Sequence, residues 1–309
     1  MKEELKFVVD NSEYVSINYK KINEFINQIG TPSYEHWYKK LNMSLPEEKQ
    51  ILLAFLIESM NFCFWRKPKW KIEYNNQIYN GSNALFFSII KEVEKNKDFL
   101  DINYLYNLKK EDLHKIFSPV EGEIPLLDER YKNLKEVISF VYNNKDFYKE
   151  LYQIKSDIKL IEYITKNINC FNDMSKYKGK IIHFNKRATL LANDLFHMSE
   201  TIKNNIKNVN NLCGCADYAI PRTFRDYGIL EYSKELAEII DNEKELPHDS
   251  NMEIEIRASM LYVIELIKED LTNKNISINS VELDNIIWLI GKQNQKHKSE
   301  VHHTVTIFY

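Results

Sequence analysis

Residues that interrupt helices are scarce in this chain, which has seven glycines and seven prolines among 309 residues. Because glycine and proline punctuate most folds, long uninterrupted segments remain between them. In most of these segments apolar residues recur at spacings of three and four, which is typical of amphipathic helices. The sequence therefore predicts a mainly helical protein.

Cysteines are also few, and long apolar runs are missing. Four cysteines at irregular spacing do not form the framework of a disulfide-rich secreted domain, and the Met-Lys-Glu-Glu start has no export segment. Crossing a bilayer takes roughly 20 apolar residues, and even the apolar stretch 51–64 is interrupted by Glu58 and Asn61. We expect a cytoplasmic protein with no membrane role.

The chain also lacks an excess of positive charge. The formal net charge is −3, whereas proteins that bind a nucleic-acid duplex normally present a basic face. The composition argues against a duplex partner and favours a small-molecule substrate, and nothing in the sequence indicates an obligate protein partner.

Hydrophobic residues make up 44% of the chain and aromatic residues 13%, enough to bury a substantial core. Segments 70–74 and 77–79 alternate around Asn75 and Asn76, which predicts a two-residue hairpin. The β-branched and aromatic tail 301–309 is a candidate third strand for this hairpin. A tail strand would tie distant parts of the chain together, which favours a single compact helical domain that comprises residues 1–309.

A capping-box pattern, Ser44 with Glu47, predicts that a helix begins before the apolar run from Ile51. That helix should deliver segment 61–65 at its end. The polar segment 203–211 predicts a loop. Further helices are expected from Gly81 onward and over 127–142, 156–168, 187–202, 252–271 and 280–289.

Asp217 is the most informative single residue, because it lies among apolar neighbours and four residues before Pro221. Burying such a carboxylate without a partner costs several kcal/mol, and the proline favours the end of an element nearby. That position suits a catalytic base or nucleophile, and it equally suits a helix cap.

Two charged pairs offer further candidates. Glu253 and Arg257 are four apart on an expected helix and can pair along one face, whereas Glu255 must find another partner. Lys186 and Arg187 begin an expected helix, where the dipole disfavours cations and favours an anion such as phosphate. The alternative for each pair is an ordinary solvated surface charge.

Two other patterns are less specific. Cys213 and Cys215 lack the C-x-x-C spacing of a zinc chelate, so we expect no metal. The aromatic set of Phe62, Phe64, Trp65 and Trp70 suits stacking on a planar base, and it equally suits the core.

Together these motifs, in their order along the chain, resemble the queuosine salvage glycosidase family, which releases queuine from queuosine 5′-monophosphate. They span nearly the whole chain. The matching blocks are 61–65, 124–130, 184–188, 216–221, 228–233, 253–258 and 302–309.

The resemblance implies a fold related to helical DNA glycosylases, hydrolysis of an N-glycosidic bond, and no cofactor. It also implies that Asp217 is the catalytic carboxylate, which either attacks C1′ or stabilises an oxocarbenium-like transition state. Either Glu255 or Asp284 would read the guanidine-like edge of the base. The expected substrate-binding residues are Lys186, near the sugar phosphate, with Asn61, Phe64, Trp65, Tyr218, Glu255, Arg257, Asp284 and His302.

The sequence departs from the family pattern at Thr189, Cys215, Ala219 and Arg222, which leaves the phosphate requirement open. Two other functions remain: a helical glycosylase acting on another modified base, and a non-catalytic module that binds a modified nucleoside. Salt-sensitive duplex binding would indicate the first, and stoichiometric binding without base release the second.

Overall fold

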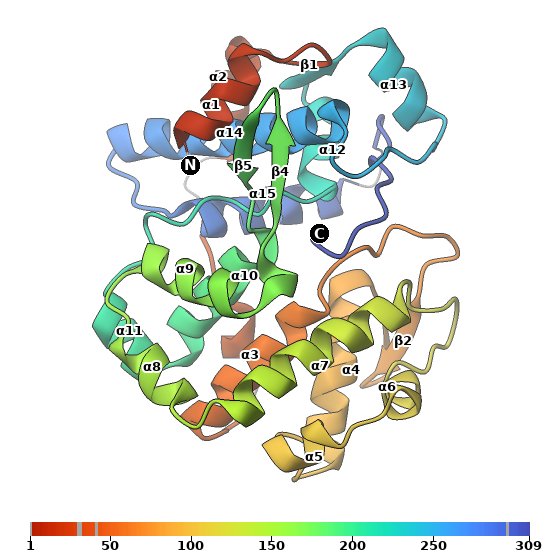
Figure 1. Cartoon of the computed structure of the whole chain (residues 1–309). Coiled ribbons are helices and arrows are strands. Elements are labelled where there is room, and N and C mark those ends of the chain that lie inside the picture. The colour runs from red at the N-terminus through yellow and green to blue at the C-terminus, as the bar shows by residue number, and fades with distance from the viewer. Residues whose placement is uncertain (1, 30–32, 41–42, 295–296) are drawn as a thin grey trace. The chain divides into compact units, whose positions relative to one another are not determined.

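A computed structural model describes residues 2–29, 33–40, 43–294 and 297–309 of the chain (Figure 1). This part contains fifteen α-helices, two short 3₁₀ helices and six strands, which confirms the prediction of a mainly helical protein. None of the described helices is both long and apolar enough to cross a membrane.

The chain forms two compact units that alternate along the sequence. The first comprises Met1–Lys39, Asp173–Leu190 and Val209–Val305, and the second comprises Lys40–Asn172, Leu191–Asn208 and Thr306–Tyr309. A single domain over 1–309 therefore stays a prediction.

The first unit is built around α14 (Asn251–Asn273), whose start is capped by the Ser250 hydroxyl, which accepts from the Glu253 N–H. Every residue from Glu253 to Leu261 is buried, and a helix covered on all sides belongs in a core. Contacts with α14 come from α1 (Lys2–Asp10), α2 (Tyr19–Ile29), β1 (Val15–Ile17), α12 (Ala219–Asp226) and α15 (Ser280–Gln293).

A hairpin in this unit was not predicted. Strands β4 (Met174–Tyr177) and β5 (Lys180–His183) pair antiparallel around Lys178 and Gly179, which both have positive φ. The hairpin leads into α10 (Lys186–Met198). The remaining elements are α13 (Lys234–Asp241), the 3₁₀ helix η1 (Trp37–Lys40) and β6 (Leu230–Tyr232). Strand β6 pairs with β1.

The second unit has its own core, in which the Phe55 ring of α3 (Glu47–Ser59) packs edge-on against Phe147 and Phe171. All α3 residues from Ile51 to Ser59 are buried. The other elements are β2 (Lys71–Tyr74), β3 (Gln77–Asn80), α4 (Gly81–Lys95), α5 (Ile102–Tyr106), α6 (Lys110–Ile116), α7 (Leu127–Asn143), α8 (Phe147–Gln153), α9 (Asp157–Asn167), η2 (Asn169–Phe171) and α11 (Glu200–Ile206).

The predicted hairpin at 70–79 is confirmed, with Asn75 and Asn76 at positive φ in its turn. The proposed third strand is wrong. The Lys71 backbone already donates to Glu121 O and accepts from Val120 N, both at 2.9 Å. The tail instead makes an isolated bridge between His303 and Glu245.

Two helix boundaries also differ from prediction. The Ser44 capping box is wrong: Pro46 is the N-cap of α3, and the Glu47 carboxylate accepts from Ser199 Oγ at 2.5 Å. The helix expected over 187–202 breaks at Ser199, which caps α11 by accepting from the Ile202 N–H. A serine hydroxyl favours a helix start over a helix interior, so α11 occupies the beginning of the expected loop.

Candidate active site

Asp217 immediately precedes the N-cap residue of α12, and its Oδ1 accepts hydrogen bonds from the N–H groups of Ala219 (2.9 Å) and Ile220 (3.1 Å). The helix-cap interpretation is therefore confirmed. The cap uses one oxygen, and no hydrogen bond to Oδ2 occurs within the described residues. The residue as a whole is partly exposed, but its carboxyl group is buried. A catalytic role remains compatible with this geometry, because one oxygen is held and the other has acceptor capacity to spare.

Asp284 lies on α15 and is buried, and its Oδ1 accepts from the Cys215 N–H at 2.8 Å. Gly214 allows this approach. A Cβ at that position would lie 3.1 Å from Asp284 Oδ1 and 2.9 Å from Ile264 Cδ1. The loop that leads to Asp217 is thereby held against the second carboxyl group.

The Lys186 ammonium acts on both carboxyl groups, and the negative charge of Asp217 acts on Asp284. Burial raises the pKa of Asp217, whereas Lys186, the two helix N–H groups and Arg222 act in the opposite direction. Burial and the negative charge of Asp217 raise the pKa of Asp284 well above its ordinary value, against the Cys215 N–H and Lys186. Such a pair releases its protons in two steps. Both pKa values are raised, that of Asp284 more strongly.

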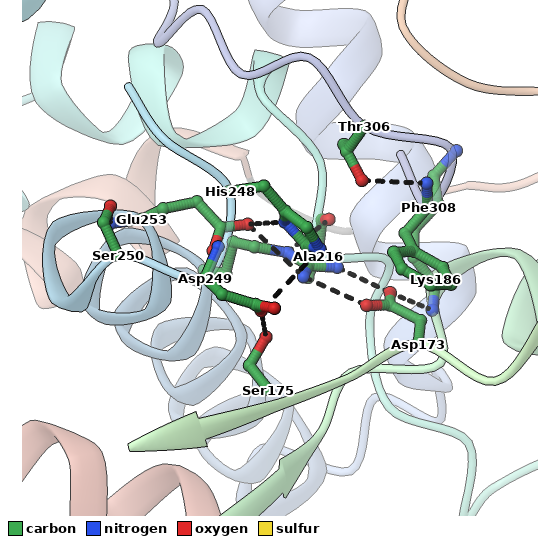
Figure 2. A network of polar contacts seen from close by, with 11 residues as sticks. Asp173, Ser175, Lys186, Ala216, His248, Asp249, Ser250, Glu253, Thr306 and Phe308 are labelled. Carbon is green, nitrogen blue, oxygen red and sulfur yellow. Dashed lines mark hydrogen bonds and ion pairs between the residues drawn. The ribbon is translucent and has the colours of Figure 1, made fainter. Parts of the chain in front are cut away.

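A buried ion-pair network joins α14 to Asp173, the residue before β4 (Figure 2). Arg257 on α14 donates from Nη1 to Asp173 Oδ1 (3.1 Å) and from Nη2 to Asp173 Oδ2 (2.6 Å). Its Nη1 also contacts Glu253 Oε1 at 3.5 Å, which confirms the predicted pairing of these two residues. Sequence reasoning missed Asp173, because an isolated acid before a short strand has no distinctive spacing.

Glu255 has a different environment, although it lies on the same helix. Its Oε2 accepts from the backbone N–H groups of Glu13 (3.0 Å), Tyr14 (2.6 Å) and Val15 (3.2 Å), and its Oε1 lies 2.8 Å from the Tyr177 hydroxyl. All these partners are protein groups. Glu255 therefore holds the segment after α1 against α14.

The other predicted residues fall into two groups. In the first unit, Tyr218 is the partly buried N-cap residue of α12. His302 is buried, and burial lowers its pKa to about 3, with the charge of Arg257 in the same direction. His302 is therefore neutral at physiological pH.

In the second unit, Asn61 Nδ2 lies 3.1 Å from both carboxylate oxygens of Glu58. The Phe64 ring stacks on Trp70 at 6.4 Å, and Trp65 is partly buried. The structure thus brings Lys186, Asp217, Tyr218 and Asp284 together within the first unit, while the predicted base-stacking residues belong to the second unit.

Comparison with known proteins identifies the family. The queuosine salvage protein model matches residues 41–309. This chain belongs to the queuosine salvage protein family. A protein of Sphaerobacter thermophilus is 28% identical over 98% of this chain and 95% of its own length. Relatives from Dictyostelium discoideum (25%) and Mus musculus (26%) are matched over 100% of this chain and 98% of theirs. All three carry the name queuosine 5′-phosphate N-glycosylase/hydrolase.

Family membership confirms the resemblance drawn from the sequence motifs. One set of described residues has metal-ligand atoms close together: His248, Asp249 and Glu253, within 4.8 Å of one another. The Arg257 guanidinium already contacts Glu253, and its positive charge opposes a cation there.

Proposed function

We propose that this protein hydrolyses the N-glycosidic bond of queuosine 5′-monophosphate and releases queuine, in agreement with the names of its nearly full-length relatives. The observation that carries the proposal is the Asp217 carboxylate. One of its oxygens is fixed by the start of α12, and it lies under the influence of the Lys186 ammonium and a second carboxyl group.

The leaving group determines what the site must supply. Queuine is a 7-deazaguanine and lacks the N7 atom at which purines are protonated before they depart. Catalysis must therefore act mainly at the sugar. The ionised Asp217 oxygen stabilises the positive charge that develops at C1′, or attacks C1′ directly. Both routes require Asp217 to be ionised.

Lys186 and Asp284 complete the proposed chemistry. The Lys186 ammonium favours the ionised form of Asp217 and supplies a positive charge for the sugar phosphate. A protonated Asp284 is a hydrogen-bond donor, so it stabilises negative charge on the departing base. The geometry favours this role for Asp284 over Glu255, whose oxygens bind four groups of the protein itself.

Three further expectations are part of the proposal. Asn61, Phe64 and Trp65 form part of the base pocket, the fold of residues 1–309 is a single domain related to helical DNA glycosylases, and the protein is cytoplasmic. All four cysteines are buried thiols, which fits a reducing compartment.

Queuine release tests the proposal directly. Purified protein is incubated with queuosine and, separately, with queuosine 5′-monophosphate, and free queuine is followed by chromatography. We expect release mainly from the monophosphate, and its loss in Asp217→Asn. Asp241→Asn is the matched control, because Asp241 lies in the same unit but pairs with Arg225 at the surface. Near-normal turnover by folded Asp217→Asn would contradict the mechanism.

A further inference from the structure

A single buried guanidinium, that of Arg257, connects the segments that carry Lys186 and Asp217. We infer that Arg257 and Asp173 are positioning residues that set the separation between the Lys186 ammonium and the Asp217 carboxylate. The inference rests on the proposed function, because it assigns a purpose to the geometry of that same site.

The Lys186 side of the connection runs through Asp173. The Asp173 Oδ2 accepts from the Lys186 N–H at 3.2 Å, and its backbone oxygen accepts from the N–H groups of Phe184 (2.9 Å) and Asn185 (3.0 Å). A carboxylate at the start of α10 also offsets the positive end of the helix dipole. This is the anion that the Lys186–Arg187 helix start requires, and the protein supplies it.

The Asp217 side of the connection runs through the backbone. Arg257 Nε donates to the carbonyl oxygen of Ala216, the residue before Asp217, at 3.3 Å. The Phe184 ring packs over the guanidinium at 4.0 Å. Figure 2 shows that Asp173, Ala216 and Glu253, from three separate segments, lie around one cluster of polar contacts.

The planar guanidinium is suited to this task. Its donors have fixed directions, so the two bonds to Asp173 and the bond to Ala216 hold their acceptors in one arrangement. Arg257 is fully buried. A lysine keeps the charge at this position but cannot donate to both sides with the same geometry.

The consequence for chemistry is electrostatic. The charged groups that act on Asp217 are Lys186 and Arg222, which favour its ionised form, and Asp284, with which it is coupled. Of these, Lys186 is held at its backbone, where its N–H donates to the Asp173 carboxylate. Because charge interactions weaken with distance, displacement of Lys186 should make Asp217 harder to ionise.

Arg257→Lys tests the inference, with Arg225→Lys as the matched control. Arg225 also makes two bonds to one carboxylate, that of Asp241, at 2.7 and 3.0 Å. For Arg257→Lys we expect kcat on queuosine 5′-monophosphate to fall roughly 10- to 100-fold, because small misplacements of reacting groups have effects of this size. KM should change less. The acidic limb of the pH–rate profile and the NMR titration of the Asp217 carboxyl carbon should both move to higher pH. The control should leave both unchanged.

The titration needs no substrate, so the two proposals can fail separately. Absence of queuine release from the wild type would overturn the proposed function, while the titration would still decide the positioning role. An unchanged Asp217 titration in folded Arg257→Lys would overturn the inference even if the wild type is active. If Arg257→Lys does not fold, Asp173→Glu, which shifts the carboxylate by about 1.5 Å, is judged by the same readouts.

Discussion

Two sets of carboxyl groups in the first unit illustrate opposite uses of buried acid. In Asp173 and Glu255, both oxygens accept hydrogen bonds from backbone N–H groups, a guanidinium or a hydroxyl. In Asp217 and Asp284, one oxygen accepts from the backbone, and within the described chain no bond to the second oxygen is found. The first set stabilises the fold, whereas the second set keeps a raised pKa and acceptor capacity, as active sites commonly do.

The largest effect on activity is expected for Asp217→Asn. We expect a loss of queuine release of about 10³-fold or more, because the site loses its ionisable oxygen. The amide oxygen can still accept from Ala219 and Ile220, so the melting temperature should change little. Chromatography of the released base and a thermal melt measure the two effects. A large fall in melting temperature would assign Asp217 to the structural set.

Asp284→Asn should separate activity from stability. We expect queuine release to fall about 10²-fold, since the proposed donor to the base is lost. Stability at neutral pH should rise, because the raised pKa means that the native state retains a proton that the unfolded chain releases. Native stability therefore falls as pH increases through the folded pKa, and asparagine removes this penalty.

Denaturant unfolding over a range of pH tests whether Asp284→Asn raises the free energy of unfolding. The advantage of Asp284→Asn should be largest at neutral pH and should shrink as pH falls toward 3.8, the ordinary pKa of aspartate. A variant less stable than the wild type at neutral pH would show that the charge of Asp284 is needed for folding.

Glu255→Gln should lower the stability of the protein and leave its activity nearly unchanged. Replacing a charged acceptor by a neutral one weakens the bonds to Glu13, Tyr14 and Val15, and the free energy of unfolding should fall by about 1 to 2 kcal/mol. The kcat per folded molecule should stay within about twofold of the wild type. A selective rise in KM, with stability unchanged, would instead support the predicted substrate contact.

The smallest change in stability is expected for substitution of His248, which lies beside Glu253. Burial lowers the pKa of His248, but Glu253 and Asp249 more than offset this, so the pKa is raised overall. The resulting stabilisation is complete below the ordinary value of 6.5 and is lost as pH rises through the raised folded pKa. His248→Gln should reduce stability by about 0.5 kcal/mol at pH 6 and hardly at all at pH 9. Equal effects at both pH values would rule out the charge as the cause.

Much of the local structure could be predicted because it depends on neighbours in the chain. The period of apolar residues indicated the helices, and Asn75 with Asn76 indicated a hairpin because both tolerate positive φ. The spacing of four between Glu253 and Arg257 predicted their contact. The expectation that Pro221 ends an element near Asp217 is wrong, because α12 begins just after Asp217 and Pro221 lies in its first turn. The order of the motifs was enough to indicate the family.

Tertiary structure decided which acids are satisfied and which are not. Arg257 meets Asp173 across 84 residues, Glu255 meets Val15 across 240, and Asp284 meets the Cys215 N–H across 69. No periodicity within one segment encodes such pairings, since they depend on how separate helices and loops pack. Sequence alone therefore indicated most of the helices, the hairpin at 70–79 and the candidate acids other than Asp173. Packing assigned Glu255 to the fold and left Asp217 and Asp284 with acceptor capacity to spare.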